Sequence, residues 1–307
     1  MARLLSAAWL IASCGPARTS PELVSNRCEF GAARSLGPVV NSDVFDGSPA
    51  VSSDETELYF TSARGGQQDI FVATRPSRKA VWGAPVNVGS LVNDPAADDF
   101  SLRLSSDGLS LYFASTRAGG FGKSDLYVAT RASTHQPWGR ASNLGPILNT
   151  DAFEAFPTPA ADGKTLYFNR SMTFDSQDSD IWVTSRASPG GQWTTPQPLP
   201  GGINSERAEF SPSVSPDGHS MYFASARGGS IELWVSSRTP GPAWGEPRRL
   251  GAEVNIPLSM TLAPFVTADE RSLYFMAARP ETGQGACTPM TCFNRLDLYV
   301  ASATCGR

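Results

Sequence analysis

One pattern recurs five times along this chain of 307 residues, at intervals of 52 to 55 residues. Each copy has an aspartate in a polar turn followed by an apolar triplet such as Leu-Tyr-Phe. The turn aspartates are Asp54, Asp107, Asp162, Asp217 and Asp269. A repeat of this length is one supersecondary unit that cannot bury its apolar faces alone. We therefore expect five such units to pack against one another.

Each repeat is expected to form four short strands. Asp-Gly pairs such as Asp107-Gly108 and Asp217-Gly218 are typical of tight hairpins between a first strand and the Leu-Tyr-Phe strand. A third strand is indicated by tetrads that an acid opens, which begin at Asp69, Asp125, Asp180, Glu232 and Asp297. A fourth strand is expected in segments that open at Trp82, Trp138, Trp193 and Trp244. Aromatic and β-branched residues suit strands that are covered on both faces.

The sequence therefore predicts an all-β fold, a five-bladed β-propeller of four-stranded antiparallel blades. The last acid-led tetrad, which begins at Asp297, is followed by only seven residues and no Trp segment. Residues 30–37 match residues 82–89 in spacing, with Phe30 at the position of Trp82. We expect this N-terminal strand to complete the fifth blade and close the ring.

The composition of the chain excludes other classes of protein. Lys and Arg number 25 against 29 Asp and Glu, so the net charge of −4 argues against a nucleic-acid binder. The 28 glycines and 24 prolines are spread along the chain, which excludes a helical bundle. The sequence has no run of eighteen apolar residues, the length that a helix needs to cross a membrane.

The first 14 residues have a basic residue, Arg3, and then an apolar run, as export signals do. Their end, Ile11-Ala12-Ser13-Cys14, resembles the lipobox of bacterial lipoproteins, with Ile11 in place of the usual Leu. The resemblance implies lipidation of Cys14, a tether over residues 15–29 and a propeller domain over residues 30–305. Gly15, rather than Asp, favours the outer membrane. An ordinary cleaved signal and a chance apolar start are the alternatives.

Four further cysteines remain, an even number for an oxidising compartment. Cys287 and Cys292 lie five residues apart and are predicted to pair locally. Cys28 and Cys305 would then join the two ends of the ring. Their counterparts in the second repeat, Ser133 and Gln136, flank one hairpin, so this pair lies within reach of a disulfide.

The stretch from Ser215 to Gly229, with its Pro-Asp-Gly core, resembles the WD-like repeat of TolB-type β-propellers. Related stretches extend the resemblance over residues 30–305. The family includes periplasmic partners of envelope lipoproteins, modules beside peptidoglycan-binding domains and the substrate-filtering propellers of oligopeptidases. The resemblance is specific for fold, and its implications for function are correspondingly broad.

An acid is predicted near the start of each of four innermost strands, five residues after an asparagine. These candidate ligand-binding or ion-binding residues are Asp46, Asp98, Glu154 and Glu209. In the fifth repeat the same count ends on Met260. Carboxylates around one axis repel each other unless a cation or backbone amides offset their charge. They could serve the blade itself, bind an ion or cationic ligand, or catalyse a reaction.

An arginine recurs after the second strand and is expected to pair with the acid that opens the third strand. The set is Arg64, Arg117, Arg227 and Arg279, whereas the third repeat has Met172 at this position. Its loop carries Asp175, Asp178 and Asp180, which could bind calcium, although no cofactor is expected otherwise. Two histidines, His135 and His219, leave little basis for a catalytic triad or a histidine-rich metal site.

Loops between the second and third strands vary in length and share one face with the inner-strand acids. The longest, residues 280–296, makes this face the candidate binding surface. The main prediction is a monomeric, non-catalytic, envelope-anchored propeller that binds a protein or an envelope polymer there. One alternative is a glycoside-active enzyme that uses the inner-strand carboxylates. Another is a scaffold stabilised by a divalent ion.

Overall fold

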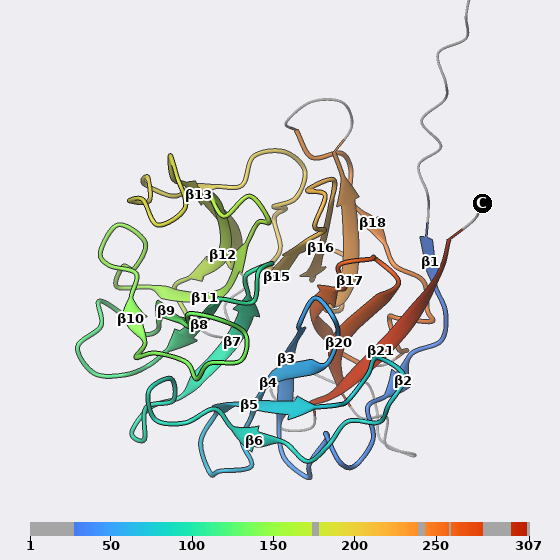
Figure 1. The fold of residues 1–307 in the computed structure, drawn as a ribbon. Coiled ribbons are helices and arrows are strands. Elements are labelled where there is room, and N and C mark those ends of the chain that lie inside the picture. Colours follow the sequence, from blue (N-terminus) through green and yellow to red (C-terminus); the bar gives the residue numbers. More distant parts are fainter. Residues whose placement is uncertain (1–27, 174–177, 239–242, 258, 279–295, 306–307) are drawn as a thin grey trace, which may run out of the picture.

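The structure is a computed structural model that describes residues 28–173, 178–238, 243–257, 259–278 and 296–305 (Figure 1). All of its regular elements are strands, arranged as five antiparallel blades. Blade 1 contains β3 Asp46–Val51, β4 Glu57–Ser62, β5 Asp69–Thr74 and β6 Val86–Asn87. Blade 2 contains β7 Asp99–Leu104, β8 Ser110–Ser115, β9 Asp125–Thr130 and β10 Ser142–Asn143. Blade 3 contains β11 Phe153–Pro159, β12 Thr165–Ser171, β13 Asp180–Ser185 and β14 Gln197–Pro198.

Blade 4 contains β15 Glu209–Val214, β16 Ser220–Ser225, β17 Glu232–Ser237 and β18 Arg248–Arg249. Blade 5 contains β19 Thr261–Val266, β20 Ser272–Ala278, β21 Leu296–Cys305 and two N-terminal strands, β1 Cys28–Phe30 and β2 Arg34–Ser35. The first strand of every blade packs against the first strand of the next, and β19 packs against β3. The predicted five-bladed propeller is therefore confirmed.

The ring closes through the N-terminal strands. Both β1 and β2 pair antiparallel with β21, beside each other in Figure 1. The register places Cys28 directly opposite Cys305. Opposed Cα atoms in an antiparallel pair lie about 4.5–5.5 Å apart, a separation that a disulfide can bridge. The seam is confirmed, the disulfide stays a prediction, and Cys287 and Cys292 lie outside the described residues.

Five phenylalanines, one in the second strand of each blade, form the centre of the core. They are the largest fully buried side chains: Phe60, Phe113, Phe168, Phe223 and Phe275. The fourth strands of blades 1 to 4 are only two residues long. Each Trp that was expected to open a fourth strand therefore lies before the strand begins. All four of these Trp rings stack under the arginine that directly follows the third strand, with guanidinium-to-ring separations of 3.9 to 4.3 Å for Arg75, Arg131, Arg186 and Arg238.

Five asparagines connect neighbouring blades. Asn149, for example, accepts a hydrogen bond from the Leu126 amide of blade 2 and donates to its carbonyl, at 2.8 and 3.1 Å. Asn41, Asn93, Asn204 and Asn255 contact the third strand of the preceding blade in the same way. The asparagine that precedes each inner strand therefore fixes that strand against the neighbouring blade.

Each inner strand has a bulge near its middle, where one non-glycine residue has a φ between 48° and 56°. The residues are Ser48, Ser101, Phe156, Ser211 and Ala263. In four blades a proline follows the bulge residue. Proline cannot donate to a ladder and is found at such irregularities. The bulges interrupt the ladder in the part of each blade that faces the axis.

Candidate functional site

Three of the four predicted inner-strand acids lie at the start of their strands as expected: Asp46 and Glu209 are the first residues, and Glu154 is the second. Asp46, Glu154 and Glu209 are completely buried. In blade 2 the equivalent residue is Asp99 rather than Asp98, because one additional residue separates Asn93 from the strand. Asp98 is half-buried, and its Oδ1 accepts a hydrogen bond of 2.9 Å from the Gln68 amide. In blade 5 the position is taken by Thr261 rather than Met260.

Each of these buried acids pairs with an arginine, an arrangement we call the acid–arginine bridge. Arg64 reaches Asp46 at 2.8 Å, Arg117 reaches Asp99 at 2.5 Å and Arg227 reaches Glu209 at 3.1 Å. The prediction that these arginines pair with the acid of the third strand is therefore wrong. Their Nε atoms donate to a serine two residues earlier, which turns each guanidinium back toward the inner strand. Arg279 lies outside the described residues.

Blade 3 forms the same bridge from a different position. Met172 stands where the arginine is expected, but Arg170, two residues earlier, donates from Nε to Glu154 at 2.8 Å. Its guanidinium lies 4.4 Å from the centroid of the Trp182 ring. In the other blades the position of Arg170 holds serine in three cases and Ala277 in blade 5. The bridge is thus preserved although the sequence pattern is broken.

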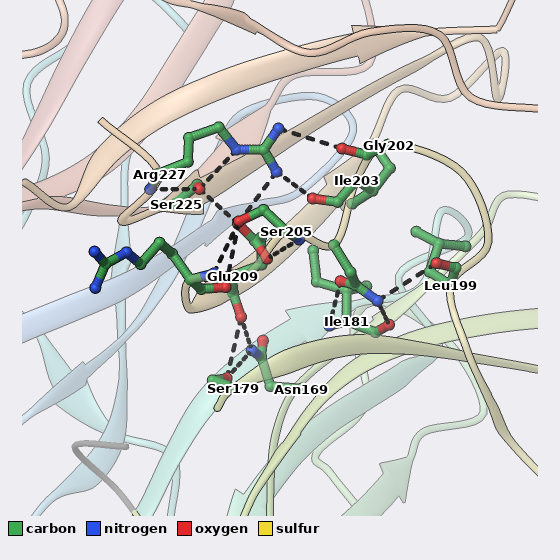
Figure 2. A network of polar contacts seen from close by, with 12 residues as sticks. Asn169, Ser179, Ile181, Leu199, Gly202, Ile203, Ser205, Glu209, Ser225 and Arg227 are labelled. Carbon is green, nitrogen blue, oxygen red and sulfur yellow. Dashed lines mark hydrogen bonds and ion pairs between the residues drawn. The ribbon is translucent and has the colours of Figure 1, made fainter. Parts of the chain in front are cut away.

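Figure 2 shows the bridge in blade 4. The Glu209 carboxylate accepts hydrogen bonds from the Ser205 amide and hydroxyl at 2.7 Å each, from the Ser225 hydroxyl at 2.7 Å and from Arg227. The Glu209 carbonyl accepts from Asn169 of blade 3 at 2.7 Å. With no exposed surface and several donors, this carboxylate has the surroundings of a structural ion pair. The same holds for its counterparts, and burial raises the pKa of Asp99 and of Glu154 despite their arginines.

The acids that open the third strands differ from blade to blade. Asp69 accepts from Gln67 and Asn87 at 3.1 and 2.9 Å, and Glu232 forms a two-pronged pair with Arg249. Asp125 accepts from two loop amides and from Asn143. Asp180 has no hydrogen-bond donor among the residues that the structure describes. It is the least satisfied of the described acids at this position.

The electrostatic surroundings of Asp180 are also distinct. The half-buried carboxyl lies at the start of β13, next to the buried Glu209 and the exposed Asp178. Burial raises the pKa of Asp180, and the negative charges of Glu209 and Asp178 raise it further. Asp180 therefore holds its proton to a higher pH than an ordinary aspartate.

The possible calcium site in this loop is described only in part. Asp175 lies outside the described residues, whereas Asp178 and Asp180 lie within them. Among the described residues, no three or more His, Cys, Asp or Glu side chains form a group suited to a metal ion. The described part of the chain also contains no helix long and apolar enough to span a membrane.

No family model matches this chain, and no curated protein matches it either. Solved structures do align with it. An α-L-arabinofuranosidase from Lactobacillus brevis is 15% identical over 87% of this chain and 92% of its own, with a TM-score of 0.59. The α-L-arabinofuranosidase PaAbf62A from Podospora anserina is 11% identical over 90% of this chain and 97% of its own, with a TM-score of 0.58. Both show likeness of fold.

A putative TolB from Agrobacterium tumefaciens aligns at 14% identity over 90% of this chain and 98% of its own, with a TM-score of only 0.49. Of what the resemblance to TolB-type propellers implies, the strand pairing confirms the propeller fold. The prediction of a non-catalytic binding propeller is corrected, because several glycoside hydrolases align over most of both chains with TM-scores of 0.55 to 0.59. That prediction rested on the resemblance to one family of propellers.

Proposed function

We propose that this chain is a glycoside-active propeller that cleaves α-L-arabinofuranosides. The observation that carries the proposal is Asp180, a half-buried carboxyl with a raised pKa and no donor among the described residues. Glycoside hydrolysis usually requires one carboxyl that is protonated and a second that is ionised. The fold shared with two arabinofuranosidases suggests the sugar.

The roles in this proposal follow from the surroundings of each carboxyl. Asp180 is the general acid, which protonates the leaving oxygen of the glycosidic bond. Asp178 is exposed, and its charge acts on Asp180, so we assign it the second role, as base or nucleophile. Glu209, whose own oxygens are occupied, helps to keep the proton on Asp180. The inner-strand acids are buried, so they are not part of the proposed catalytic pair.

Replacing Asp180 with Asn is expected to lower kcat on an aryl α-L-arabinofuranoside about 10²–10⁴-fold, because the general acid is lost. The matched control is Asp69→Asn, at the same position of blade 1, where Gln67 and Asn87 already donate to the carboxylate. This control should keep near-normal activity. Release of the aryl group and of arabinose from arabinoxylan provides the measurement.

The pH profile supplies a second readout. Because the acid must be protonated, wild-type activity should fall as pH rises through the raised pKa of Asp180. This decrease in activity with rising pH should be absent from the residual activity of Asp180→Asn. If the wild-type chain had no activity on aryl α-L-arabinofuranosides or on arabinoxylan, the proposed function would be refuted. Equal losses in Asp180→Asn and Asp69→Asn would refute the assignment of Asp180.

We further propose that the chain is exported and carries lipid on Cys14, as its resemblance to lipoproteins and to TolB-type repeats suggests. Cells that express the full chain and are labelled with palmitate should give a labelled protein, and Cys14→Ser should remove the label. Ser13→Ala is the neighbouring control. Equal labelling of wild type and Cys14→Ser would contradict this proposal.

A further inference from the structure

A cavity of about 110 Å³ lies on the propeller axis, at the ends of the inner strands. Residues from all five inner strands line it, among them Val51, Arg103, Thr158, Ser213 and Phe265. The turns that follow the inner strands, such as Ser52-Ser53 and Ser105-Ser106, surround it as well. Asp180 lies near the start of β15, so the axial cavity is at the other face of the ring.

Arg103 breaks the repeat inside this cavity. Pairing with the second strand shows that the equivalent residues are Ala50, Thr158, Ser213 and Phe265. A side chain that recurs in every blade has a structural role in the blade. A guanidinium that occurs at this position in one blade alone needs an explanation specific to that blade. Only 2% of Arg103 is exposed.

The polar partners of Arg103 are backbone carbonyls. Its Nη1 donates to Pro49 and Leu102 at 3.2 and 3.1 Å, and its Nη2 donates to Pro264 at 2.5 Å. Within the described part of the chain, its Nε has no hydrogen-bond partner and no carboxylate lies within ion-pair distance. The described lining of the cavity contains neither Asp nor Glu.

This situation contrasts with that of the bridge arginines. Arg64, Arg117, Arg170 and Arg227 each have a carboxylate partner, and each is more exposed than Arg103. A buried charge without a counter-ion is costly, and burial lowers the pKa of Arg103 to about 9. Carbonyl dipoles offset part of this cost. An anion in the cavity that Arg103 lines would offset the remainder.

We propose that the axial cavity binds a small organic carboxylate, with the guanidinium of Arg103 as its counter-ion. A guanidinium matches the planar carboxylate geometry and is less strongly hydrated than an ammonium group. The volume accommodates an acid of a few carbon atoms. The Phe265 ring and Val51 offer apolar contact to its alkyl part, and Ser213 offers a hydroxyl.

The test uses the full chain and three probes of nearly equal shape: propionate, propionamide and propylammonium. We expect propionate to bind in calorimetric titration and to raise Tm with concentration. Propionamide and propylammonium should bind at least tenfold more weakly. Since this comparison uses wild-type protein, it does not depend on the folding of a variant.

Arg103→Met keeps much of the side-chain length and removes the charge, so it should abolish propionate binding. Arg249→Met, which removes an exposed arginine, should leave binding unchanged. Equal binding of propionate and propionamide, or no propionate binding at millimolar concentrations, would overturn the proposal. So would undiminished binding to folded Arg103→Met. None of these outcomes depends on glycoside activity.

Discussion

Replacing Arg227 with Met is expected to lower the free energy of unfolding by about 3–5 kcal/mol, because it leaves the fully buried Glu209 carboxylate without its counter-ion. The change also removes the hydrogen bonds that the guanidinium donates to the carbonyls of Gly202 and Ile203. Those bonds join the segment that follows β16 to the loop that precedes β15. Urea denaturation followed by tryptophan fluorescence gives the measurement.

Arg249→Met is the matched control for Arg227→Met. It breaks an ion pair with Glu232 in the same blade, but the Arg249 side chain is 44% exposed. Exposed pairs contribute about 0–1 kcal/mol, so this loss should be small. Similar destabilisation by the two variants would show that the acid–arginine bridge is no more important than a surface pair.

Replacing Phe113 with Ala is expected to destabilise the fold by about 3–5 kcal/mol, because the ring is fully buried between blades 1 and 2 and a cavity would remain. The ring also lies 5.9 Å from the Tyr127 ring and 5.3 Å from the Arg117 guanidinium. Its loss should therefore weaken the bridge to Asp99. Calorimetric unfolding, together with urea denaturation, would measure the effect.

Phe121→Ala is the control for this change, since the Phe121 side chain is 48% exposed in the loop before β9. Its backbone amide, which donates to Asp125, is retained. We expect a change within about 0.5 kcal/mol. If Phe121→Ala destabilised the chain as strongly as Phe113→Ala, the central role of the second-strand phenylalanines would be refuted.

The architecture could be predicted from the sequence because each blade has the same local pattern. The turn aspartates, the Leu-Tyr-Phe strands and the acid-led tetrads all recur, and their period set the number of blades. The incomplete last repeat also identified Phe30 as part of the closing strand. These are consequences of strand alternation and turn chemistry, which act over a few residues.

The site was harder to predict, because counting along the chain does not follow the register of a strand. One additional residue after Asn93 shifted the buried acid of blade 2 from Asp98 to Asp99, and a shift of one residue reverses the face of a strand. In blade 3, Arg170 replaced the missing arginine from two positions away, on the same face. A fixed count therefore found the bridge in some blades and missed it in others.

The sequence by itself determined the five-fold repeat, the strands of each blade and the seam at which the ring closes. Only the tertiary structure decided which charges are paired. It buried Asp46, Asp99, Glu154 and Glu209 against arginines, left Asp180 without a donor among the described residues, and enclosed Arg103 on the axis. The physical reason is that the free-energy cost of a charged side chain in the fold depends on its burial and on partners from distant segments, whereas a repeat specifies only local conformation.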